Sequence, residues 1–249
     1  MPNDKYNNKI SIIMPAYNCG HCISSSIRQV YNTMREEELN FEIIIVNDGS
    51  SDNTSDAVLE TMRELNSDSI KLISYPKNMG KGYAFVRGFK ESTGDIIVLF
   101  DADLDIPPPQ IPFMVKILKR KNADIVITNK WHPLSKTQAS FKRFALSTGF
   151  NFLVRFLTGI SLRDTQTGAK CFRRHVLNAI TKRLFVKRFA IDVEILLLAQ
   201  KMGFKIVEVP SIATINLSSN FYVNDIMKMF LELLSITYRH GRVFNSKRR

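Results

Sequence analysis

The first half of the chain alternates short apolar runs with longer stretches in which apolar residues recur at helical spacing. Short apolar runs are typical of buried strands, and the longer period is typical of amphipathic helices. The pattern predicts strands at 10–14, 42–47, 71–74, 95–100 and 124–128. It predicts helices near 22–37, 54–66, 82–91 and 110–121. This order indicates an α/β fold with a mostly parallel, Rossmann-like sheet and helices on both faces.

Two stretches of the second half, 140–160 and 224–240, place large apolar residues at helical spacing among basic residues. Such C-terminal amphipathic helices suit the interface of a membrane. Ordinary helices that face the protein core, followed by a basic tail, are the alternative interpretation.

Polar motifs follow four of the predicted strands, at 15–18, 47–52, 78–82 and 101–105. The carboxyl ends of parallel strands lie at the same edge of a sheet, and ligands bind there. We therefore expect the four loops to converge on one ligand site.

The loop at 101–105 carries three carboxylates, Asp101, Asp103 and Asp105. On an extended chain these alternate residues point to one side, where they repel one another unless a cation lies among them. Mg²⁺ or Mn²⁺ is the expected occupant, because hard oxygen ligands suit these ions and no Cys/His cluster for zinc is visible. Solvated acids beside a turn are the alternative interpretation.

The composition excludes a disordered chain, since 45% of the 249 residues are hydrophobic. The net charge of +12 is unevenly distributed: segment 116–188 holds seventeen Lys and Arg against two Asp, and the remainder is slightly negative. This asymmetry indicates an anionic partner. Nucleic acid, a phosphorylated substrate and an anionic membrane all satisfy it, as does a solvated basic face without a partner.

The polar start of the chain lacks the apolar core of a signal peptide, and no stretch approaches the length of a spanning helix. We expect a cytoplasmic protein, or one bound peripherally to the cytosolic face of a membrane. Three cysteines fit a reducing compartment. Cys19 and Cys22 have the spacing of a redox pair, but the residues around them serve another pattern.

That pattern consists of five motifs, at 13–18, 45–54, 78–82, 101–108 and 164–172. In this order they resemble family 2 glycosyltransferases with the GT-A fold, and most of all the synthases that load glucose or mannose onto dolichyl phosphate. The resemblance implies one GT-A domain over 1–249. It would consist of a nucleotide-sugar half at about 10–125, an acceptor half at about 126–220, and an amphipathic helix with a basic tail at about 221–249.

The resemblance also implies roles for residues of the donor side. The residues expected to bind the nucleotide-sugar are Pro15, Tyr17, Asn18, Asp48, Gly49, Lys81, Asp101, Ala102 and Asp103. Asp101, Asp103 and Asp105 are the expected metal ligands, and Asp105 stands where mannose synthases often have Gln. Asp52 is a better candidate than Asp48 for capping the helix at 54–66.

For the acceptor side the resemblance implies a second set of residues. Those expected near the acceptor or the sugar are Arg143, Ser147, Asp164, Gln166, Asp192 and Glu194. Asp103, Lys130 and Arg143 are expected to carry the reaction, although Lys130 stands where these synthases commonly have Arg. Segment 218–220 departs from the Ser-Lys of many relatives. For Asp192 and Glu194 we favour structural or sugar-positioning roles.

The expected activity is inverting transfer of a hexose from a nucleotide-sugar, UDP-glucose before GDP-mannose, to polyprenyl or dolichyl phosphate with Mg²⁺ or Mn²⁺. One alternative is a family 2 enzyme acting on a glycan hydroxyl, with Asp192 or Glu194 as base. Another is a basic nucleic-acid-binding module, but no base-reading motif is visible and the acidic cluster would face the polyanion. We therefore expect no nucleic-acid partner, and oligomers are possible.

Overall fold

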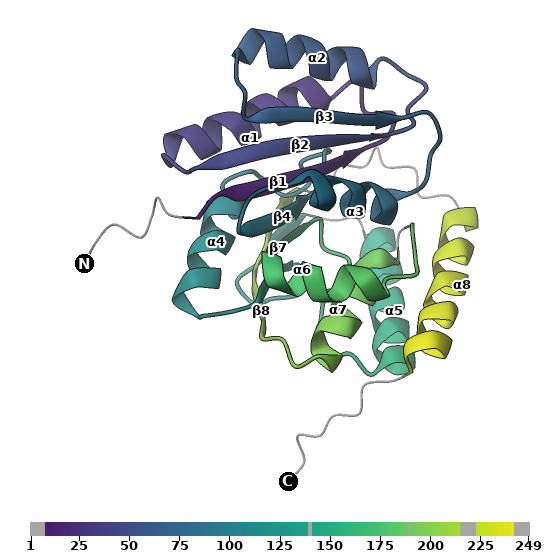
Figure 1. The fold of residues 1–249 in the computed structure, drawn as a ribbon. Helices are drawn as coiled ribbons and strands as arrows, with labels where there is room; N and C mark the ends of the chain where they lie inside the picture. Colours follow the sequence, from purple (N-terminus) through teal and green to yellow (C-terminus); the bar gives the residue numbers. More distant parts are fainter. Residues whose placement is uncertain (1–7, 139–140, 189, 215–222, 242–249) are drawn as a thin grey trace.

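The computed structural model of the protein describes residues 8–138, 141–188, 190–214 and 223–241; within them, the side chains of 136–147, 213–214 and 223–227 lie outside the description. A seven-stranded sheet with the order β3-β2-β1-β4-β7-β5-β8 forms the centre (Figure 1). Its strands are β1 Ile10–Ala16, β2 Phe41–Asp48, β3 Ile70–Tyr75, β4 Ile96–Phe100, β5 Ile125–Asn129, β7 Ala169–Arg173 and β8 Ile206–Pro210. A small parallel pair joins β6 Lys136–Gln138 to β9 Ile212–Thr214.

Helices cover both faces of the sheet (Figure 1). One face packs against α1 Ile23–Glu36, α2 Thr54–Leu65 and α4 Gln110–Arg120. The opposite face packs against α3 Lys81–Glu91, α5 Phe141–Thr158, α6 Arg174–Ile180, α7 Ile191–Lys201 and α8 Val223–His240. A short 3₁₀ turn, η1 Thr181–Arg183, follows α6. The predicted α/β class with helices on two faces is confirmed.

The apolar patterns explain why these elements form. All eight residues of β2 are buried, as expected of a strand covered on both faces. The buried apolar residues of α1 recur at intervals of three and four positions, so that they line a single face. At about 1.5–3 kcal/mol for each large apolar side chain, this burial is the main stabilising contribution.

Strand β7 runs antiparallel between β4 and β5, and the sequence pattern did not predict it. Lys170 interrupts its apolar residues, so the sequence lacks the continuous apolar run that is typical of a buried strand. The pairing sets Ala169 opposite Phe100, so the segment before β7 lies beside the acidic loop after β4. The antiparallel insertion therefore brings the motif at 164–172 to the edge where β1, β2, β3 and β4 end.

The two predicted amphipathic stretches are the helices α5 and α8, which lie side by side (Figure 1). Within the part of the chain that the structure describes, no helix is both long enough and apolar enough to cross a bilayer.

Candidate active site

The acidic loop after β4 is held by the elements around it. The backbone N–H of Asp101 donates to the carbonyl oxygen of Gly168 at 3.0 Å. The Ser26 hydroxyl on α1 donates to the carbonyl oxygen of Ala102 at 2.6 Å. Leu104 adopts a φ of 54°, a left-handed conformation uncommon for residues other than glycine. The loop is therefore fixed on two sides and turns sharply at Leu104.

This turn changes the geometric premise of the prediction that three carboxylates converge on one cation, while the cation itself remains a prediction. That prediction assumed an extended chain, which the conformation of Leu104 interrupts. Asp103 instead accepts a hydrogen bond from the backbone N–H of Asp105 at 3.2 Å. Among the described residues, no three His, Cys, Asp or Glu side chains are grouped to hold a metal ion.

A site with fewer protein ligands fits the residues present. Mg²⁺ is commonly held by one or two carboxylates, with water and substrate phosphates completing its shell. Desolvation and the nearby charge of Asp103 raise the pKa of Asp101, against the effect of Lys81. Desolvation and the charge of Asp105 raise the pKa of Asp103. Asp101 and Asp103 thus offer hard oxygen ligands in a place that favours a cation.

Four charged side chains form a chain of ion pairs behind the acidic loop. Lys81 Nζ lies 2.7 Å from Asp101 Oδ1 and 3.5 Å from Asp192 Oδ2. Lys170 Nζ lies 2.8 Å from Asp192 Oδ1. Lys81 was predicted for the donor side and Asp192 for the acceptor side. The structure joins both in one network of ion pairs.

Asp48, at the end of β2, organises the loop that follows β3. Its carboxylate accepts hydrogen bonds from the Tyr75 hydroxyl at 2.8 Å and from the backbone N–H groups of Met79 at 2.7 Å and Gly80 at 2.8 Å. Asp48 is buried. These contacts give it a structural role that the sequence analysis missed, while its contact with a nucleotide remains a prediction.

Gly49 is required where the loops after β2 and β3 meet. Its φ is 68°, and a Cβ atom there would lie 2.5 Å from the backbone carbon of Lys77. Any side chain would therefore push the two loops apart. The binding of the nucleotide-sugar by Gly49 remains a prediction.

The loop after β1 is joined to the loop after β2. The Asn18 N–H donates to Ser50 Oγ, and Asn18 Oδ1 accepts from the Ser51 N–H, each at 2.9 Å. Tyr17 is exposed and Pro15 is partly buried beside it. Pro15, near the end of β1, and Tyr17 and Asn18, on the loop that follows, thus lie at the edge where the loops meet, as the strand pattern predicted.

Asp52 carries the capping role that the sequence favoured over Asp48. Its Oδ1 accepts from the backbone N–H of Thr54 at 3.0 Å, and its Oδ2 from that of Gly20 at 2.9 Å. Desolvation raises the pKa of Asp52, but these hydrogen bonds together have the larger effect, and the pKa is lowered.

On the acceptor side, Asp164 lies against the end of β5. It is fully buried, and its Oδ2 accepts a hydrogen bond from the Lys130 N–H at 3.1 Å. Its Oδ1 has no hydrogen-bond partner among the described residues. Gln166 is partly buried two residues further on. Arg143 and Ser147 are on α5, and their side chains lie outside the described part; segment 218–220 lies outside it entirely.

Glu194 is held by structural contacts. It is fully buried, and its oxygens accept from the backbone N–H groups of Phe185 and Val186 at distances from 2.8 to 3.0 Å. His240 Nε2, at the end of α8, lies 2.6 Å from Glu194 Oε1. These contacts support the structural role favoured from sequence and leave Glu194 poorly placed to act as a base.

Cys19 and Cys22 are free thiols at the start of α1. Burial raises the pKa of Cys19 to about 11 and also raises the pKa of Cys22. Redox cysteines need the opposite shift, so the redox interpretation is not supported.

Lys170 is the residue of this network that the sequence analysis did not assign. It is fully buried on β7, between Ala169 and Cys171. A charge within a buried strand requires a partner, and this requirement could have identified it.

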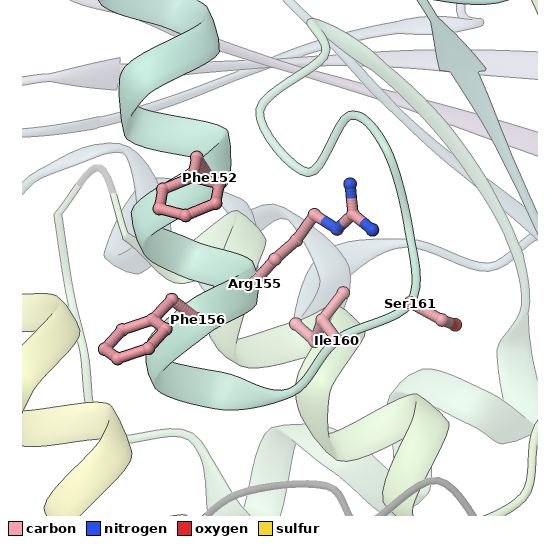
Figure 2. A pocket seen from close by; sticks show the side chains of 5 residues that line it. All are labelled: Phe152, Arg155, Phe156, Ile160 and Ser161. Carbon is pink, nitrogen blue, oxygen red and sulfur yellow. The ribbon is translucent and has the colours of Figure 1, made fainter.

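Outward-facing apolar side chains mark the two helices beside the site. Figure 2 shows a pocket of about 350 Å³ on α5, lined by Phe152, Arg155, Phe156, Ile160 and Ser161. Phe152 is 71% and Phe156 61% exposed, and their rings stack on one side of the helix while Arg155 points away from them. On α8 an exposed apolar stripe lies opposite the buried one; the exposed residues are Leu231, Leu234 and Tyr238.

The sheet, with strand-end loops that gather carboxylates and a lysine at one edge, has the architecture of the GT-A nucleotide-sugar transferases. The chain belongs to Glycosyl transferase family 2, whose family description matches residues 11–181. It is thus an enzyme of the glycosyltransferase class, and the resemblance inferred from the five motifs is confirmed.

Curated relatives are about one-third identical to the chain. A dolichyl-phosphate beta-glucosyltransferase ALG5A of Trichomonas vaginalis is 31% identical over 241 residues, which is 93% of this chain and 73% of the relative. Dolichyl-phosphate beta-glucosyltransferase of Homo sapiens is 31% identical over 218 residues, 83% of this chain and 67% of the relative.

Solved structures share the fold at lower identity. Glucosyl-3-phosphoglycerate synthase of Mycobacterium tuberculosis, in complex with Mn²⁺, UDP-glucose and phosphoglyceric acid, has a TM-score of 0.72 at 18% identity, covering 96% of this chain and 82% of that one. The mannosyltransferase PcManGT of Pyrobaculum calidifontis, in complex with GDP-Man and Mn²⁺, has a TM-score of 0.68 at 19% identity, covering 98% and 68%. Both of these neighbours bind Mn²⁺ alongside a nucleotide-sugar.

Proposed function

We propose that this glycosyltransferase moves a hexose from a nucleotide-sugar to polyprenyl or dolichyl phosphate at a membrane surface, with inversion at the sugar carbon. UDP-glucose is the first choice of donor and GDP-mannose the second. The names of the relatives that are 31% identical support glucose and dolichyl phosphate.

Asp101 and Asp103 are the residues that would hold Mg²⁺ or Mn²⁺ on the donor side. A bound divalent ion would stabilise the charge that develops on the diphosphate as the sugar–phosphate bond breaks. Lys81, whose side chain is 17% exposed, is positioned beside Asp101 to add a second positive charge. We assign the base and ribose to Pro15, Tyr17 and Asn18, with Asp48 and Gly49 beside them.

The acceptor in this proposal needs no general base. A phosphate monoester has a second pKa of about 6, so its oxygen is already a nucleophile near neutral pH. Consistent with this, Asp192 is paired with two lysines, and Glu194 is committed to backbone N–H groups and a histidine. Lys130 and Arg143 are assigned to the acceptor phosphate, and the buried Asp164 and the neighbouring Gln166 to the sugar.

A membrane surface is the proposed location of the acceptor. The exposed phenylalanines of α5 and the outer stripe of α8 would enter the interface of the bilayer. The positive surplus of segment 116–188 matches an anionic leaflet. The extent 1–249 as one domain is part of the proposal.

The observation that carries the proposal is the 2.7 Å contact between Lys81 and Asp101 at the edge where the parallel strands end. This contact sets a carboxylate that can bind a cation beside an ammonium that can bind a diphosphate. Both lie at the edge where parallel sheets bind their ligands. In the test, purified protein with Mn²⁺ receives a panel of nucleotide-sugars and either polyprenyl phosphate or soluble glycan acceptors.

Labelled lipid from UDP-glucose, lost in Asp103→Ala, is the expected result. Product on a soluble glycan hydroxyl without any lipid product would replace the proposal with the hydroxyl-acceptor alternative.

A further inference from the structure

Lys170 is the most deeply buried member of the charged network. Its side chain is fully buried, and its ammonium donates to the carbonyl oxygen of Thr167 at 2.5 Å. It also forms an ion pair with Asp192, at 2.8 Å. Burying an ammonium here costs free energy unless the ammonium is paired. The presence of Lys170 therefore requires an explanation other than packing.

The network becomes more exposed from Lys170 outward. The exposed fraction of the side chain is 0% for Lys170, 5% for Asp192, 17% for Lys81 and 32% for Asp101. Charges alternate in sign along this series. Lys170 is thus the inner end of a chain whose outer end is the proposed site of the donor diphosphate.

The position of Lys81 depends on how strongly Asp192 attracts it. At present Lys81 lies close to Asp101, at 2.7 Å, and further from Asp192, at 3.5 Å. Lys170 partly neutralises the negative charge of Asp192 and so weakens the attraction between Asp192 and Lys81. Without the ammonium of Lys170, Lys81 would be the one remaining charged partner of the buried Asp192 among the described residues and would be drawn inward.

We propose that Lys170 is a positioning residue: acting through Asp192, it holds the ammonium of Lys81 at the outer edge of the network, where Lys81 meets the donor diphosphate. This inference rests on the proposed function. It assigns Lys170 no contact with the substrate.

The test is a double-mutant cycle on nucleotide binding. The dissociation constants of UDP and of GDP, each with Mn²⁺, are measured by titration calorimetry for wild type, Lys170→Met, Lys81→Met and the double variant. Lys170→Met should raise the dissociation constant about tenfold, the size expected for one charge-assisted contact. The double variant should bind no more weakly than Lys81→Met, because both changes remove the same contact. Additive losses would overturn the inference.

A second pair of variants tests whether Lys170 acts through Asp192. Lys170→Met leaves the charge of Asp192 less compensated and should destabilise the fold, whereas Lys170→Met with Asp192→Leu removes both buried charges and should restore much of the stability. Because Asp192→Leu also removes the carboxylate that would draw Lys81 inward, this double variant should bind UDP almost as tightly as wild type. Binding as weak as that of Lys170→Met would show that Lys170 does not act through Asp192.

The exposed Lys182→Met on η1 is the matched control and should change neither stability nor binding. If wild-type protein binds neither UDP nor GDP with Mn²⁺, the proposed function itself fails, and this inference with it.

Discussion

Gly168 illustrates how one residue sets the geometry of the acidic loop. Its carbonyl oxygen accepts the N–H of Asp101, and a Cβ atom at Gly168 would lie 2.7 Å from Asp101 Oδ2. A methyl group there would displace the carboxylate that pairs with Lys81. The absence of a side chain is therefore part of the proposed metal site.

We predict that Gly168→Ala lowers kcat/KM about 10- to 100-fold, because small displacements of reacting groups have effects of this size. Steady-state kinetics with varied Mn²⁺ measures it. Gly149→Ala is the matched control, since a Cβ atom there meets nothing within 4 Å. Equal activity of the two variants would argue against a role for the Asp101 geometry.

At the residue scale, the sequence predicted that the loops carrying the expected donor and metal residues meet at one edge, but it did not predict all of their contacts. Asp101 and Asp103 were recognisable because carboxylates at the end of a buried strand are conspicuous. The hydrogen bond between the Asp105 N–H and the Asp103 carboxylate depended on the backbone turn at Leu104, which no residue type in the sequence indicated. The role of Asp48 as an anchor for Met79 and the role of Lys170 depended on tertiary neighbours.

At the scale of elements, Glu42 ties three neighbouring strands, β1, β2 and β3, together. It is 1% exposed on β2, accepts from Ser11 Oγ on β1 at 2.7 Å and from the Thr93 N–H at 2.6 Å, and pairs with Lys71 on β3 at 2.9 Å. Burial opposes its ionisation, but these contacts outweigh burial and lower its pKa from 4.5 to about 2. The folded protein therefore binds fewer protons here than the unfolded chain.

We predict that Glu42→Gln lowers the free energy of unfolding by about 3 kcal/mol at pH 7. The stabilisation by Glu42 is complete above pH 4.5 and is lost as the pH falls towards 2, so the difference should shrink to about half at pH 3. Urea unfolding at both pH values measures this. Glu60→Gln, on the exposed side of α2, should show no such difference; a pH-independent gap for Glu42→Gln would refute the ionic explanation.

The exposed phenylalanines of α5 give a second prediction at this scale. The double change Phe152→Ser and Phe156→Ser should reduce binding to lipid vesicles about tenfold or more, because each buried aromatic ring contributes more than 1 kcal/mol. Vesicle co-sedimentation measures it. Phe113→Ser on α4, 39% exposed on the other face of the sheet, is the control. Equal losses in both would exclude α5 as the docking face.

Elements were more predictable than contacts. The five strands and the helices of the first half were found, because their apolar periods are clear and local. Strand β7 was missed, because Lys170 interrupts its apolar run and its partners, β4 and β5, are distant in sequence. The helical spacing at 140–160 and 224–240 predicted α5 and α8 but left open which of their faces is buried.

At the scale of the whole molecule, the uneven charge and the exposed apolar faces belong to the same half of the chain. Segment 116–188 contains α5 and all of the positive surplus. We predict that binding to anionic vesicles exceeds binding to neutral ones and weakens as salt rises from about 0.1 to 1 M, since the Debye length falls from about 10 to 3 Å. Binding that depends neither on the charge of the lipid nor on the salt concentration would contradict an electrostatic contribution.

The central claim is that a divalent cation, held by Asp101 and Asp103, links the enzyme to the diphosphate of its donor while a lipid phosphate attacks. The most direct measurement follows radiolabelled glucose from UDP-glucose into polyprenyl phosphate, with chelator-treated protein before and after addition of Mn²⁺. We predict no lipid product until Mn²⁺ is restored, and none with Asp101→Ala at any metal concentration. Full transfer by chelated wild-type protein, or by the alanine variant, would contradict the claim.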